Sequence, residues 1–275
     1  MSIAAPLDPS LMAAESAFRA EQRRKALRRR IMPVIGIGSF LLLWAGLVYG
    51  LKVPPFVAPS PFAVAATLWA KAPMLFENLV PTMIEAISGF MLGNLSAILI
   101  ATAFVYKKSL EEAFFPVIVI INTIPVVAKA PILVLLLGNG MEPKIAIAAL
   151  ICFFPTLVNM VRGLQSVNPQ AMELMRVLSA SQREIFFKLR LPNSLPYLFS
   201  ALKIAASTAV IGAIVGEWIG STVGIGALII QATYAFDSAL LYATVIVGSC
   251  FSVVFFLLIT LIERLTLRRH GPAAQ

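Results

Sequence analysis

The chain alternates long apolar runs with short polar stretches, and the lengths of these runs predict membrane-spanning helices. A helix needs about 20 apolar residues to cross a hydrocarbon core roughly 30 Å thick. Several runs approach or exceed that length, and charged, proline-rich or glycine-rich residues separate them. We therefore expect an all-α, polytopic membrane protein whose six spans cover residues 31–51, 82–105, 113–137, 144–161, 197–215 and 239–262.

Three stretches between these spans carry their own signals. The first span is followed by a proline-rich stretch and a short amphipathic segment, 63–72, which we expect at the outer interface. Residues 216–238 are punctuated by glycine and too broken for a full span, which favours an outer loop or a re-entrant turn. The most highly charged insert is 171–192, for which we expect two short helices. Within the second span, Gly89 and Gly93 form a G-x-x-x-G pattern that permits close helix approach.

Composition supports the membrane assignment. The chain is 59% apolar and only 13% charged, whereas soluble domains average roughly 45–50% apolar and 25% charged residues. We expect a basic N-terminal tail at 1–30, a transmembrane domain at 31–265 whose principal loop covers about 164–195, and a short C-terminal tail at 266–275. The two cysteines, Cys152 and Cys250, lie in apolar runs and are predicted to be small buried side chains, not a disulfide.

The distribution of basic residues predicts the orientation. Of the 22 Lys and Arg residues, 17 lie before the first span, at 107–108, in the segment 162–190 and after residue 262, all on one side of the six-span arrangement. The other side has Lys52, Lys71 and Lys144. Because positively charged loops stay in the cytoplasm, both termini and the insert 171–192 are predicted to be cytoplasmic. The net charge of +9 thus reflects membrane flanks and does not indicate nucleic-acid binding.

The insert has the spacing of a known motif. It reads Glu-Leu-Met, three residues, Ser, nine residues, Leu, one residue and Leu-Pro. This resembles the cytoplasmic EAA loop of permease subunits of bacterial binding-protein-dependent ABC importers, which reads EAA, three residues, Gly, nine residues and I-x-LP. Glu173, Leu191 and Pro192 match by identity, and the remaining positions match by spacing alone. The resemblance implies contact with an ATPase through Glu173, Leu174, Met175, Ser179, Leu189, Leu191 and Pro192.

The local chemistry of the insert favours the same role. Met172, Met175 and Leu178 recur at helical spacing and predict an apolar stripe. Ser181 and Glu184 form a Ser-x-x-Glu capping box that starts a second helix. Between the two helices the chain turns at Ser179, where the family pattern has glycine. A non-glycine residue in the left-handed region costs roughly 1–2 kcal/mol, so the geometry of this turn is the point that the sequence leaves open.

The resemblance extends over most of the chain, from about residue 31 to residue 264. The motifs Pro59-Ser60-Pro61, Ile124-Pro125 and 216–220 (Gly-Glu-Trp-Ile-Gly) are similar to those of the nitrate, sulfonate and taurine subgroup, which includes permeases for pyrimidine thiamine precursors and riboflavin. The resemblance implies a multi-pass protein of the bacterial inner membrane that imports a small solute. It also implies an assembly with ABC ATPase subunits, an extracytoplasmic solute-binding protein and a second permease copy.

No enzymatic chemistry is expected in this chain. It lacks the Gly-x-x-x-x-Gly-Lys-Ser/Thr phosphate loop, so ATP and Mg²⁺ are expected on the partner ATPase. No catalytic, metal or cofactor residue is predicted, since the chain has a single histidine, in the tail, and no Gly-x-Ser-x-Gly elbow. The alternative is a secondary transporter or a channel subunit without an ATPase. A secondary transporter would need coupling carboxylates in mid-membrane, but the only aspartates are Asp8 and Asp237, and neither is mid-span.

Polar residues within the apolar runs are the candidates for the translocation path. An ionisable group at the centre of a membrane helix costs about 2.5–3.5 kcal/mol and marks a functional site by default. Lys129 meets this criterion, with Asn122 in the same span. Lys129 either attracts an anion, or it snorkels to the interface or pairs with Glu85. Glu217 and Trp218 begin the re-entrant stretch, where they either line the mouth of the path or anchor it at the interface.

Overall fold

Residues 9–270 are described in a computed structural model, and every regular element within them is a helix. The predicted tails 1–30 and 266–275 lie partly outside this range, because residues 1–8 and 271–275 are not described. The elements are α1 (Pro9–Gly50), α2 (Pro61–Ala70), α3 (Ala72–Tyr106), α4 (Lys108–Thr123), α5 (Val126–Leu137), α6 (Glu142–Gln165), α7 (Pro169–Val177), α8 (Gln182–Ile185), the π-helix η1 (Phe186–Arg190), α9 (Leu191–Glu217), α10 (Ile225–Tyr234) and α11 (Ser238–His270).

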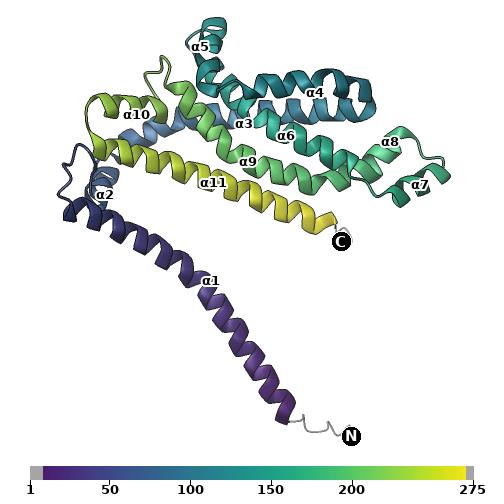
Figure 1. Cartoon of the computed structure of the whole chain (residues 1–275), viewed down its shortest axis with the longest axis horizontal. Coiled ribbons are helices and arrows are strands. Elements are labelled where there is room, and N and C mark those ends of the chain that lie inside the picture. The colour runs from purple at the N-terminus through teal and green to yellow at the C-terminus, as the bar shows by residue number, and fades with distance from the viewer. Residues whose placement is uncertain (1–8, 271–275) are drawn as a thin grey trace.

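Long helices α3, α6 and α9 form the centre of the molecule, with α11 along one side (Figure 1). Five helices within residues 9–270 are long and apolar enough to cross a membrane, and the pair α4–α5 is a sixth if it counts as one span. The all-α polytopic fold is therefore confirmed. The helices run beyond the predicted spans: α1 begins at Pro9, inside the predicted tail, and α3 begins ten residues before the predicted start of the second span.

The third span, predicted at 113–137 with prolines within it, departs most from a straight helix. It is two helices, α4 and α5, whose axes are bent by 101°. The break falls at Ile124 and Pro125, whose backbones are extended. Proline disfavours helical geometry in the residue before it and lacks an N–H to continue the ladder, which explains why the helix ends there. Bent backbone at membrane depth is tolerated where it is buried in protein or lines a cavity.

Small residues let the central helices approach closely. A methyl group on Gly89 would lie 2.8 Å from the carbonyl oxygen of Ile145, and one on Gly212 would lie 2.8 Å from the Cα atom of Ala148. Gly93 likewise lies directly against the backbone of Ala149. These contacts confirm the predicted role of the G-x-x-x-G pattern in α3 and show that α6 is the helix it packs against. Gly163 and Gly216 also lie at the α6–α9 interface, which fits membrane helix packing.

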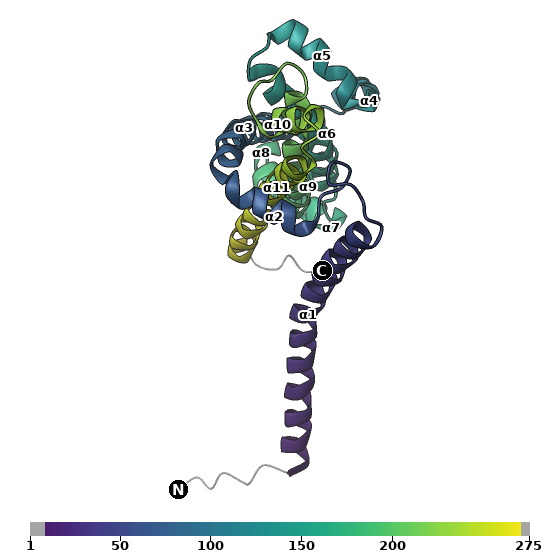
Figure 2. The same cartoon turned by 90° about the vertical axis from the view of Figure 1, so that its left-hand side faces the viewer.

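Helix α1 lies at the periphery of the fold. It extends away from the central bundle (Figure 2), and most of its apolar surface between residues 27 and 50 is exposed.

The prediction that both cysteines are buried is right for one of them: Cys152 is buried in the core, but Cys250 is exposed on α11. A membrane helix has one apolar side toward lipid, and an apolar run alone does not say on which side a residue falls.

Candidate functional site

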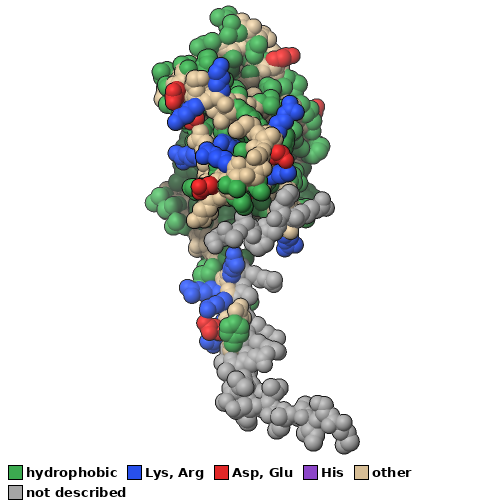
Figure 3. Space-filling model, turned by 90° about the vertical axis from the view of Figure 1, so that its right-hand side faces the viewer, with side chains coloured by type: hydrophobic (Ala, Val, Ile, Leu, Met, Phe, Trp, Pro, Cys, Tyr) green, Lys and Arg blue, Asp and Glu red, His purple; other side chains and the backbone are tan. Residues whose placement is uncertain are grey.

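The polar insert folds as a helical hairpin that projects from one end of the molecule. Helices α7 and α8 lie beyond the ends of α6 and α9, on the side where the C-terminal end of α11 also lies (Figure 1). Basic side chains gather over this end (Figure 3), and exposed Lys107, Lys108, Arg176, Arg183 and Lys188 contribute to it. The clustering of positive charge at this end agrees with the predicted cytoplasmic orientation.

The turn between α7 and α8 has the geometry that glycine usually supplies. Ser179 has φ +52° and lies in the left-handed region. Its N–H donates to the carbonyl oxygen of Arg176 at 2.9 Å, and the N–H of Ala180 donates to that of Met175 at 2.9 Å. This pair of bonds is a Schellman motif, which satisfies the last carbonyls of a helix. The turn expected at Ser179 therefore forms with serine in place of the family's glycine.

The capping box predicted for the second helix is present. The Ser181 hydroxyl accepts a hydrogen bond from the N–H of Glu184 at 3.3 Å, and the Glu184 carboxylate accepts one from the N–H of Ser181 at 2.9 Å. These reciprocal bonds satisfy two donors at the start of α8. After one turn the helix widens into η1, where Phe186 is buried and its ring lies 5.4 Å from that of Tyr106 at the end of α3.

The exposed apolar face of the hairpin is not the stripe expected from the sequence. Leu174, Val177 and Leu178 are 59%, 76% and 66% exposed, whereas Met172 and Met175 are half-buried. Of the predicted stripe, only Leu178 lies on the exposed face. The three exposed residues occur at i, i+3 and i+4, so they share one side of α7. We call this set, Leu174, Val177 and Leu178, the hairpin face. Glu173 is also exposed, beside Leu174 in sequence.

The base of the hairpin is closed by a residue that the sequence analysis did not single out. The side-chain amide of Asn193, at the start of α9, donates to the carbonyl oxygens of Gly163 and Ser166 and to the Ser166 hydroxyl, each at 3.1 Å. These groups belong to the C-terminal end of α6, whose last carbonyls have no partner within the helix. Asn193 therefore ties the entry and the exit of the hairpin together. Leu189 and Leu191, from the predicted motif, are half-buried at the same base.

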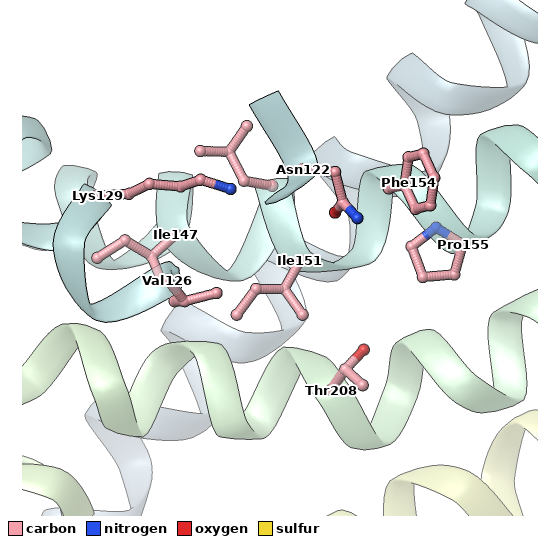
Figure 4. Close-up of a pocket in the computed structure, with 9 residues that line it drawn as sticks. Asn122, Val126, Lys129, Ile147, Ile151, Phe154, Pro155 and Thr208 are labelled. Atoms are coloured by element: carbon pink, nitrogen blue, oxygen red, sulfur yellow. The ribbon is translucent and has the colours of Figure 1, made fainter. Parts of the chain in front are cut away.

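A second polar feature lies at the break between α4 and α5. Lys129 and Asn122 point toward the same space (Figure 4), a pocket of ≈ 190 Å³ that residues of α6 and α9 also line. The cavity is otherwise lined by apolar side chains such as Ile151 and Phe154, with the Thr208 hydroxyl from α9. The structure thus places two of the four residues predicted for the translocation path in one cavity.

The other two lie elsewhere. Glu217 is the last residue of α9 and is only 1% exposed; its carboxylate is hydrogen-bonded to Thr82 and to the backbone of α10. Trp218 follows it and is 43% exposed. Of the alternatives left open for Lys129, pairing with Glu85 is wrong, because the Glu85 carboxylate lies 3.4 Å from the Nζ atom of Lys144. A lysine expected at the outer edge of a span is therefore buried in the bundle.

The described residues contain no cluster of three or more His, Cys, Asp or Glu side chains arranged to hold a metal ion. A bundle of membrane helices with a broken span, a cavity beside it that holds a lysine, and a basic helical hairpin at one end is the architecture of a membrane transport subunit. Comparison of the sequence with known protein families identifies the kind of transport subunit. Residues 89–269 match the family model described as "Binding-protein-dependent transport system inner membrane component", and the chain belongs to this family of ABC importer permease subunits.

Individual relatives agree with the family. The chain is 34% identical to "Formylaminopyrimidine transport permease protein ThiX" of Halalkalibacterium halodurans, over 78% of this chain and 86% of the relative. It is 31% identical to "Riboflavin transport system permease protein RibX" of Chloroflexus aurantiacus, over 91% and 96%. A solved amino acid ABC transporter is similar in fold, with a TM-score of 0.59 at 18% identity over 72% of this chain and 97% of that chain.

Proposed function

We propose that an ABC ATPase binds the hairpin of α7 and α8, and that its conformational change reaches this permease subunit through that surface. The observation that carries the proposal is the hairpin face, three largely exposed apolar side chains at a basic, polar end of the molecule. Exposed apolar residues at helical spacing suit insertion into a groove on a partner. ATP and Mg²⁺ belong to that partner, and this chain supplies no hydrolytic group.

Co-purification with the cognate ATPase tests the docking surface. We expect Val177→Glu and Glu173→Arg each to reduce the amount of ATPase recovered with the permease, because the first puts a charge into the apolar contact and the second reverses a charge beside it. The matched control is Glu112→Arg, which reverses an exposed charge on α4 and leaves the hairpin unchanged. Full recovery of the ATPase with both hairpin variants would refute the assignment.

The cavity at the α4–α5 break is the part of the subunit that we propose lines the translocation path. Irregular backbone within a membrane protein typically lines a cavity, and a lysine there supplies a charge that attracts an anionic or strongly polar solute. We expect Lys129→Met to abolish transport while the amount of assembled complex stays unchanged. Lys107→Met, which removes an exposed lysine from the α3–α4 turn, is the control and is expected to transport normally.

The cargo we propose is a small solute of the kinds carried by the subgroup, and a heterocycle such as a pyrimidine or a flavin is favoured over inorganic ions. The relatives named above are described as formylaminopyrimidine and riboflavin permeases. The cavity offers an aromatic ring and apolar walls beside its lysine and amide. Thermal-shift measurements on the cognate solute-binding protein with pyrimidines, flavins, sulfonates and nitrate decide between these classes.

We propose that two copies of this chain form the permease of one importer in the bacterial inner membrane. Each chain presents one hairpin, so two copies present one to each ATPase of a pair. ATP-driven closure of that pair would then move the hairpins together and rock the spans between inward-open and outward-open states. The mass of the purified complex in detergent tests this: a complex with one permease chain per ATPase pair would contradict it.

A further inference from the structure

Three ionisable side chains are buried together where α3, α6, α9 and α10 meet. Glu85 and Glu217 are each 1% exposed and Lys144 is 6% exposed. The Nζ atom of Lys144 lies 3.4 Å from Glu85 Oε1 and donates to the Ser221 hydroxyl at 2.9 Å. The carboxyl groups of Glu85 and Glu217 contact each other. Two ionised carboxylates against one ammonium would leave a net negative charge inside the bundle, which is costly.

The surroundings of Glu217 are those of a carboxylate. The Thr82 hydroxyl donates to its Oε1 at 2.5 Å, and the N–H of Gly226 donates to its Oε2 at 2.5 Å. Both oxygens therefore accept. Gly226 lies in the first turn of α10, whose N-terminus carries a partial positive charge that favours an anion. The same turn is held further by Thr82, whose hydroxyl accepts from the N–H of Ile225 at 2.9 Å.

The surroundings of Glu85 are different. Its Oε2 is the one buried side-chain nitrogen or oxygen, within the described part of the chain, that lacks a hydrogen-bond partner. Buried polar atoms are nearly always hydrogen-bonded, so this exception calls for an explanation. A proton on Oε2 provides one, because the protonated oxygen becomes a donor and the adjacent Glu217 carboxylate is an acceptor. Two carboxyl groups in contact at one site characteristically share a proton in this way.

We propose that Glu85 is a protonated carboxylic acid that donates a hydrogen bond to the Glu217 carboxylate, and that this pair, balanced by Lys144, holds α10 against α3 and α9. With one proton on Glu85 the three side chains sum to zero charge. Glu217 and Lys144 are the titratable groups that face Glu85, from α9 and α6. The arrangement makes the position of α10 depend on a single buried proton, and it stands independently of the proposed docking surface and cargo.

Two substitutions of the same chemistry separate the roles of the two acids. Glutamine at position 85 is neutral and keeps a donor toward Glu217, so Glu85→Gln is expected to unfold near the wild-type temperature in detergent. Glutamine at position 217 removes the charge at the start of α10 and presents an NH₂ group that cannot accept from Gly226. Glu217→Gln is therefore expected to unfold several degrees lower, with faster amide hydrogen exchange at residues 225–228.

Infrared spectroscopy of the full chain detects the proton directly. At neutral pH the wild type is expected to show the C=O stretch of a protonated carboxyl group, because exposed acids are ionised there, and Glu85→Gln is expected to lose it. The exposed-site control Glu112→Gln should keep the band. Absence of the band in the wild type, its persistence in Glu85→Gln, or a Glu217→Gln variant as stable as Glu85→Gln would each overturn the proposal. If Glu217→Gln does not accumulate, the loss or persistence of the C=O band in Glu85→Gln still tests whether Glu85 is protonated.

Discussion

Ser179→Gly is the substitution that most directly tests how the hairpin is built. Ser179 has φ +52°, in the left-handed region, where a side chain costs roughly 1–2 kcal/mol that glycine does not incur. Glycine also loses more backbone entropy on folding than serine does, and this cost offsets about 0.5–1 kcal/mol of the stabilisation. The exposed serine side chain makes no hydrogen bond that would be lost with it. We therefore expect a net local stabilisation of about 0.5–1 kcal/mol, close to the difference between the midpoints of these two ranges.

Amide hydrogen exchange is the assay, because opening of the hairpin does not require the bundle to unfold. The N–H groups of Ser179 and Ala180 close the turn, and their exchange reports its opening. A gain of about 0.5–1 kcal/mol corresponds to exchange slower by about twofold to fivefold. Ser200→Gly is the control: Ser200 is exposed within α9, where glycine is expected to speed local exchange. Unchanged or faster exchange at Ser179 and Ala180 in Ser179→Gly would refute the reasoning.

Three further substitutions have definite expected outcomes. Gly93→Val is expected to abolish folding, measured by detergent gel filtration, because its side chain would overlap the backbone of Ala149. Asp237→Asn is expected to flatten the pH dependence of thermal stability in acid: the hydrogen bond from Lys71 lowers the pKa of Asp237, so this stability is full above the unfolded pKa and is lost as pH falls through the folded one. Asn193→Ala is expected to keep ATPase binding but reduce transport per ATP hydrolysed.

Local signals in the sequence were sufficient for most of the fold and for the outline of the hairpin. Apolar length predicted the spans, and Ser181 and Glu184 predicted a helix start. Each of these depends on residues within a few positions of one another. The 101° angle at Pro125 could not be predicted, because a proline interrupts a helix without specifying the direction in which the chain continues.

The hairpin face shows a second kind of limit. Periodicity identified α7 as amphipathic, but two overlapping sets of apolar residues occur on this short helix: the predicted Met172, Met175 and Leu178, and the exposed Leu174, Val177 and Leu178. Which set is exposed depends on tertiary contacts that the local pattern does not contain, and the hairpin base is tied by Asn193, a residue 15 positions beyond Leu178 in the chain. An asparagine at a helix start has many local uses, so its role in tying α9 to α6 becomes visible only in three dimensions.

The wrong partner for Glu85 has a specific physical origin. From the sequence, Lys129 was the lysine embedded most deeply in an apolar run, and Lys144 lay at a span boundary. Gly216 changes this, because a side chain there would lie 3.1 Å from the Cα atom of Lys144. Because Gly216 has no side chain, α9 packs directly on the first turn of α6. This packing buries Lys144 and brings Glu217, the residue after Gly216, into the same site. The glycine and the glutamate of one short motif therefore act together: the first permits the contact, and the second places a carboxylate in it.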